Sequence, residues 1–152
     1  LTRVAMDYRH AKWRESALAE NIDPKAAIEA VRPRIGELTD AMLFKGEAPI
    51  GDTGVDGNGD FQSAFTSRFP KSKDGDSFGD FHLGNRLFKN RCSYMIHSQA
   101  FNVLPAPVKS AVFQELRDRL ENGKDCAWIP ETERMRILGI LTEIVAGFSD
   151  IP

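Results

Sequence analysis

The sequence lacks both a long apolar run and an excess of charge of one sign. No apolar stretch approaches the roughly 18 consecutive residues of a membrane-spanning helix, so we expect no transmembrane segment in this chain. Lysine and arginine number 20 against 22 aspartates and glutamates, which gives a formal net charge of −2. No basic face is dense enough to indicate nucleic-acid binding, and we predict no nucleic-acid partner.

Cysteine is scarce, with Cys92 and Cys126 as the only two in 152 residues. A pair of cysteines does not by itself set the redox compartment. They could form one disulfide in an extracytoplasmic protein, or be two unrelated buried thiols, since free cysteine is among the most buried residue types. Nothing in the sequence places the two within bridging distance, and we therefore predict two free thiols.

The chemistry-bearing motifs of common enzymes are also missing. There is no nucleophile elbow, phosphate-binding loop or dinucleotide fingerprint. The three histidines, His10, His82 and His97, form neither the paired spacing of a zinc-binding helix nor a haem-attachment motif. Cys92 and His97 do not share a helical face, so their spacing supplies no local nucleophile–base pair. We predict no cofactor and no catalytic residue from these patterns.

Asp56, Asn58 and Asp60 have the spacing that begins a calcium-binding loop, in which alternate oxygens surround one hard cation. The rest of that loop does not follow, because Phe61 stands where the turn glycine belongs and Ser67 where the closing glutamate belongs. A solvated turn rich in aspartate and glycine is the favoured interpretation. A weak metal site at Asp56, Asn58 and Asp60 is the alternative.

Apolar residues do recur at helical spacing, which predicts an all-α fold of about five helices around one core. Residues 46–80, rich in glycine and aspartate, are predicted to form one long loop with a short helix over 61–69. We treat residues 1–152 as a single helical domain. The other expected helices span residues 1–21, 23–44, 81–101, 107–122 and 130–146, and the one over 81–101 should be interrupted near residues 90–92.

Several of these helices carry further predictions. Pro33 lies inside the apolar stripe of the second helix and should kink it or split it in two. Gly123 and Gly147 should follow the ends of the last two helices. The last helix is apolar on most sides, so it should be the central, buried one. The predicted core residues are Val112, Leu116, Leu120, Ile137, Leu138, Leu141 and Ile144.

Residues 87–107 read LFKNRCSYMIHSQAFNVLPAP. This string resembles a motif of uncharacterised bacterial cell-envelope proteins, in which Leu-Phe and a basic residue precede Cys-Ser-Tyr, an isoleucine, Ser-x-Ala-Phe and Leu-Pro. The resemblance extends over most of the chain. It implies the C-terminal part of a larger exported protein, periplasmic or otherwise extracytoplasmic, and it implies no activity. Cys126 and the glycine-rich segment 54–60 depart from the family pattern.

Three functions are compatible with the sequence. The favoured one is a non-catalytic interaction or scaffold domain, whose long loop contacts a protein partner or the N-terminal part of the same protein. The second is a small-molecule-binding or hydrolytic enzyme domain with a pocket formed by residues 86–97. The third is a subunit of a haem or metal electron-transfer assembly. The candidate ligand-binding residues of the second function are Arg86, Arg91, Ser93, Tyr94 and His97.

Overall fold

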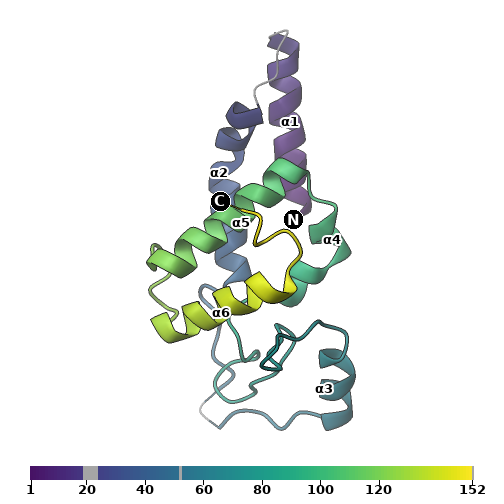
Figure 1. Ribbon diagram of the computed structural model, residues 1–152, viewed down its shortest axis with the longest axis vertical. Helices are drawn as coiled ribbons and strands as arrows, with labels where there is room; N and C mark the ends of the chain where they lie inside the picture. The colour runs from purple at the N-terminus through teal and green to yellow at the C-terminus, as the bar shows by residue number, and fades with distance from the viewer. Residues whose placement is uncertain (19–23, 52, 152) are drawn as a thin grey trace.

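The computed structural model describes residues 1–18, 24–51 and 53–151, which form six α-helices and one 3₁₀-helix (Figure 1). No strand forms in these ranges, where the only β-type pairing is an isolated antiparallel bridge between Phe81 and Phe88. The predicted all-α class is therefore confirmed. The helices are α1 (Thr2–Leu18), α2 (Pro24–Met42), α3 (Gly59–Thr66), the 3₁₀-helix (Tyr94–His97), α4 (Gln99–Asn102), α5 (Ala106–Asn122) and α6 (Glu131–Ile144).

Helix α5 is the central element, because it packs against α1, α2 and α6. In Figure 1 it crosses the α1–α2 hairpin, and α6 runs back alongside it. Val112, Leu116 and Leu120 of α5 are completely buried, as are Ile137 and Leu141 of α6. The prediction that these five residues belong to the core is confirmed.

The prediction that the last helix is the central one is wrong. Met135 on α6 is 42% exposed. Leu138 and Ile144 are only partly buried, although both pack against the core. Apolar residues on α6 thus extend beyond the face that meets α5, and composition alone could not show which face is covered.

Two glycines end helices as predicted. Gly123 has a φ of 67°, and its N–H bonds to the carbonyl of Arg119, so it closes α5 in the left-handed conformation. Gly147, with a φ of 80°, lies just beyond α6. The predicted end of the first helix at residue 21 and the predicted start of the second at residue 23 lie outside the described residues.

The predicted split at Pro33 does not occur. Helix α2 continues through this residue from Pro24 to Met42. Proline removes one N–H donor from a helix, and here its ring is on the exposed side. Val31 and Ile35 are buried on either side of Pro33, so core packing holds both halves of the helix against the body of the molecule.

The helix predicted over 81–101 does not form in residues 81–89, before the predicted interruption near residues 90–92. Leu83 has a φ of 55°, which an α-helix does not allow. The rings of Phe81 and Phe88 stack with centroids 5.4 Å apart. Aromatic packing therefore sets the backbone of this segment in place of a helical repeat, and helix forms only in the 3₁₀-helix and α4.

The predicted short helix in the long loop is present as α3, at the opposite end of the molecule from the C-terminal end of α1 (Figure 1). Asn58 is its N-cap, and the side-chain oxygen accepts the N–H of Phe61 at 2.8 Å. No residue of α3 is fully buried. The helix is instead held by the ring of Phe65, whose centroid lies 5.2 Å from Phe81 and 5.2 Å from Tyr94.

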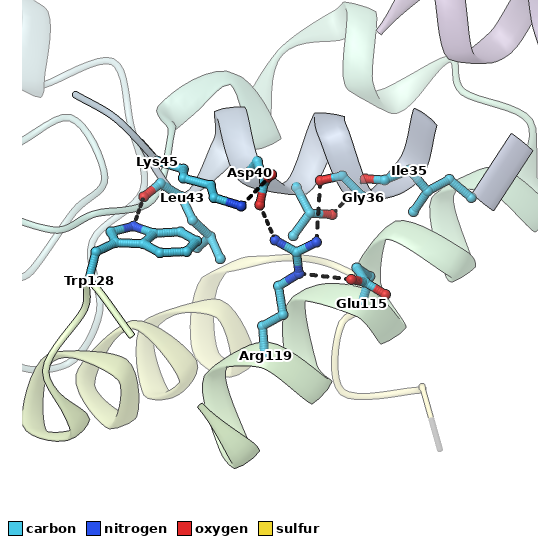
Figure 2. A network of polar contacts seen from close by, with 9 residues as sticks. Ile35, Gly36, Asp40, Leu43, Lys45, Glu115, Arg119 and Trp128 are labelled. Carbon is cyan, nitrogen blue, oxygen red and sulfur yellow. Dashed lines mark hydrogen bonds and ion pairs between the residues drawn. The ribbon is translucent and has the colours of Figure 1, made fainter. Parts of the chain in front are cut away.

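A buried guanidinium joins α5 to α2 (Figure 2). Arg119 is 7% exposed; its Nη1 pairs with Asp40 on α2, and its Nε donates to Glu115 at 2.8 Å. Its Nη2 reaches the carbonyl of Gly36 at 3.4 Å. Burial acts to raise the pKa of Asp40, but the hydrogen bonds from Lys45 and Arg119 outweigh it and hold that pKa below its ordinary value.

Replacing Arg119 by methionine should lower the free energy of unfolding by about 2–3 kcal/mol, because Asp40 and Glu115 would lose their buried partner. Both carboxylates are 29% exposed and recover part of their hydration, which keeps the loss below that of a fully buried pair. Urea denaturation measures it. The control is Arg32→Met, which breaks an exposed pair with Glu29 and should have a much smaller effect. Equal losses in the two variants would contradict this account.

Candidate functional site

Two of the predicted ligand-binding residues, Arg86 and Arg91, meet at the carboxylate of Glu133 in the first turn of α6. Oε2 of Glu133 lies 3.2 Å from Nη1 of Arg86 and 2.5 Å from Nη1 of Arg91. The other oxygen accepts the backbone N–H of Arg91 at 3.2 Å. Glu133 is only 7% exposed. Two guanidinium groups therefore share one carboxylate, which leaves one positive charge in a largely buried setting.

A pocket of about 350 Å³ opens beside this ion-pair cluster. It lies where the beginning of the long loop meets the helical body. Its walls combine two cations, one carboxylate, one amide and two aromatic rings. Nε of Arg86 is buried and has no hydrogen-bond partner among the described residues. The lining residues are Phe44, Gly46, Glu47, Pro49, Asn85, Arg86, Arg91 and Trp128.

Phe44, in the wall of this pocket, has a strained backbone. Its φ of 55° is left-handed, at the position after α2 where glycine is usual. The N–H of Phe44 bonds to Ala41 and that of Lys45 to Asp40, which is the hydrogen-bond pattern of a glycine-terminated helix end. A bulky residue there costs about 1–2 kcal/mol. The ring stacks on Phe88 at 5.8 Å and 12°, and this packing offsets the strain.

The other predicted ligand-binding residues lie elsewhere. The hydroxyl of Ser93 accepts the N–H of Met95 at 3.3 Å and starts the 3₁₀-helix. The ring of Tyr94 packs 5.1 Å from Phe69. His97 lines a separate small cavity of about 150 Å³. The structure thus brings Arg86 and Arg91 together and keeps Ser93, Tyr94 and His97 away from them.

Sequence reasoning missed the partners that complete the pocket. Glu133 belongs to no motif in the sequence, and its spacing from Arg91 carries no pattern. Trp128 lies in the connector between α5 and α6, and Glu47 lies in the loop that follows α2. Their proximity depends on how the long loop returns to the helices, which no local periodicity encodes.

The weak metal candidates, Asp56, Asn58 and Asp60, are exposed. Asn58 uses its side-chain oxygen to cap α3, and Asp60 lies in the first turn, where a negative charge favours the helix. In the part of the chain that the structure describes, no group of three or more histidine, cysteine, aspartate or glutamate side chains is placed to hold a metal ion. The positions fit the favoured interpretation of a solvated turn that leads into a helix.

Cys92 and Cys126 are both free and completely buried. Burial raises the pKa of both thiols above the ordinary value. Because the thiolate is the nucleophile, a raised pKa makes a cysteine unreactive at neutral pH. Neither cysteine has the environment of a nucleophile.

Aromatic rings form a continuous cluster under the long loop. Phe61 lies at its outer edge and is 60% exposed, with ring centroids 6.0 Å from Phe65 and 6.2 Å from Phe81. Phe88 lies at its inner end and is 7% exposed. The cluster therefore runs from the protein interior to the surface. We call it the aromatic cluster; its members are Phe44, Phe61, Phe65, Phe69, Phe81, Phe88 and Tyr94.

Comparison with protein-family models, with curated proteins and with solved structures finds no match to this chain. The resemblance of residues 87–107 to bacterial envelope proteins therefore stays a prediction. Among the helices within the described ranges, none has both the length and the apolar character needed to cross a bilayer.

His97 should make stability depend on pH. Burial lowers the pKa of its imidazole below the ordinary value of about 6.5, and its Nε2 is buried with no hydrogen-bond partner in the described structure. The folded state thus binds fewer protons than the unfolded state once the pH drops below about 6.5. Stability should fall as the pH drops from about 7.5 to about 5, and His97→Gln should flatten that dependence.

Urea denaturation across this pH range tests the His97 prediction. His82→Gln is the matched control, since His82 is exposed. It should retain the pH dependence of the unaltered protein. A His97→Gln variant with an unchanged slope would show that another group is responsible.

Proposed function

We propose that this protein is a non-catalytic interaction domain that presents the outer edge of its aromatic cluster to a protein partner. The observation that carries the proposal is the position of Phe61, which is 60% exposed although it belongs to a stack of rings. Aromatic side chains are enriched where proteins bind one another, because they bury large areas with little loss of conformational freedom.

The surroundings of Phe61 support a contact surface. Val55 and Leu87, in the same loop region, are also exposed, at 49% and 42%. The loop itself is ordered by backbone hydrogen bonds, including Val55 N–H to the carbonyl of Leu83 at 2.9 Å. A surface that is both apolar and held in shape loses little entropy on binding. Covering one phenylalanine is worth about 1.5–3 kcal/mol.

We also propose that the chain belongs to a bacterial protein that acts outside the cytoplasm. The resemblance of residues 87–107 to envelope proteins supports this location. The partner would then be another envelope protein or a further part of the same protein, and the near-balanced charge of the chain disfavours nucleic acid. Immunodetection in the periplasmic and cytoplasmic fractions of the source cells tests the location, and recovery in the cytoplasm alone would contradict it.

Phe61→Ser should abolish partner binding while leaving the fold intact. Because the side chain is 60% exposed, we expect the free energy of unfolding to change by less than about 1 kcal/mol. Lys71→Ser, an exposed change elsewhere in the loop region, is the matched control. The measurement is affinity capture from the source cells, followed by titration of the purified partner. Equal affinity for both variants would contradict the proposed surface.

A second candidate function is the binding of a small anionic ligand in the pocket at Arg86 and Arg91. The buried Nε of Arg86, which has no partner among the described residues, favours it. The two guanidinium groups and the adjoining ring of Trp128 suit a carboxylate or phosphate attached to a planar group. The electron-transfer alternative stays a prediction from sequence alone, and a visible absorption spectrum of the purified protein tests it.

Titration with benzoate and with inorganic phosphate tests the pocket. In a Trp13→Phe background the remaining tryptophan, Trp128, reports on the pocket by its fluorescence. Arg91→Gln should weaken binding about tenfold, because it removes a charged donor. Arg68→Gln, which changes an exposed arginine outside the pocket, should not. Absence of any saturable fluorescence change with both probes would remove this candidate.

A further inference from the structure

A small cavity lies where the 3₁₀-helix, α4, α5 and the end of α6 meet. Its volume is about 150 Å³, which admits a molecule of about five non-hydrogen atoms. No residue lines both this cavity and the pocket at Arg86 and Arg91, so the two are separate sites. The residues that line it on the four helices include His97, Asn102, Lys109, Phe113 and Ile144.

Lys109 brings to this cavity a positive charge that has no acidic partner among the described residues. Its Nζ lies 5.9 Å from the ring centroids of Phe101 and Phe113, and the attraction of an ammonium to ring faces favours this position. Nζ donates one hydrogen bond, to Oδ1 of Asn102 at 3.3 Å. An ammonium has three donors, so donors remain for a ligand that carries a negative charge.

His97 brings to the same wall a polar atom that lacks a partner. Its Nε2 is buried and forms no hydrogen bond within the described part of the chain. A buried polar atom without a partner is destabilising, and such atoms are few in folded proteins. An imidazole that carries its proton on Nε2 donates to a carboxylate oxygen. A ligand oxygen bound beside His97 and Lys109 would therefore satisfy both side chains.

The rest of the wall is apolar. Ile96 and Phe113 are each 2% exposed, and Val145 is 8% exposed. None of the residues that line the cavity is acidic. The cavity thus combines an apolar part with a polar end that is positive or neutral, which is the arrangement of a site for a small molecule with one anionic group.

We infer that this cavity binds a short-chain aliphatic carboxylate, with the charged end at Lys109 and His97 and the alkyl end against Phe113 and Val145. An inorganic anion such as phosphate is disfavoured, because it would leave the apolar wall without a contact. A neutral molecule of the same size is disfavoured, because it would leave the ammonium without a counterion. Neither proposed function uses this cavity, so the inference can fail independently of both.

The test is a titration of the whole chain with propionate, followed by ¹⁵N–¹H NMR. Propionamide, which has the same number of non-hydrogen atoms and no charge, is the matched control ligand. Propionate should shift the signals of His97 and Lys109 saturably, at concentrations on the order of millimolar for so small a ligand. It should bind about tenfold more tightly than propionamide. Acetate, which lacks one methylene group, should bind about fourfold more weakly than propionate.

Two variants separate the charge of the site from its volume. Lys109→Met keeps an apolar stem over the two phenylalanine rings, and it should weaken propionate binding about tenfold while propionamide binding stays the same. Lys124→Met makes the same change in net charge at an exposed lysine outside the cavity and should bind like the unaltered protein. Ala146→Leu, at an exposed position in the wall, fills the cavity and should weaken the binding of both ligands.

Four results would overturn the inference. Absence of a saturable shift at His97 and Lys109 would show that the cavity takes no carboxylate. Equal binding of propionate and propionamide would show that the site does not select for charge. Equal weakening by Lys109→Met and Lys124→Met would show that only net charge matters. Shifts that disappear in Arg91→Gln and persist in Lys109→Met would assign the carboxylate to the other pocket.

Discussion

The position of α5 against α2 depends on one buried guanidinium. Arg119 is 7% exposed; its donors reach Asp40 and the carbonyl of Gly36 on α2, while Glu115, one turn earlier on α5, holds the guanidinium in place. Apolar packing alone would allow the two helices to slide, because dispersion contacts are not directional. A buried charge tolerates such movement poorly, since any loss of its partners leaves it unpaired.

A second buried charge fixes the long loop to the helical body. Glu133 on α6 forms ion pairs with Arg86 and Arg91, which lie where the long loop rejoins the helices. Arg119 likewise pairs with acids on two helices. The aromatic cluster lies on the same loop and supplies apolar contacts where regular secondary structure is absent. Phe44 connects these features: it ends α2, stacks on Phe88 and lines the pocket beside the ion pairs. The loop is therefore an ordered surface rather than a simple connector.

The outer edge of the aromatic cluster is the surface that we propose to bind a partner. Phe61 is exposed at that edge, and Val55 and Leu87 of the same loop region are exposed as well. Backbone hydrogen bonds hold the loop that carries them, including the bond from the Val55 N–H to the carbonyl of Leu83.

The sequence by itself predicted the all-α class, the two long helices at each end of the chain and the core residues of α5. These follow from the spacing of apolar residues, which directly determines which helix face is buried. The glycine at the end of α5 followed from backbone sterics, which are equally local. Three features required tertiary structure: the continuity of α2 through Pro33, the irregular path of residues 81–93 and the meeting of Arg86, Arg91 and Glu133. Each depends on groups far apart in the chain. At Pro33, core packing outweighs the loss of one helical hydrogen bond. At Phe81 and Phe88, ring stacking outweighs the helical periodicity of the sequence. The buried carboxylate of Glu133 pairs with the cations that the folded chain brings near it.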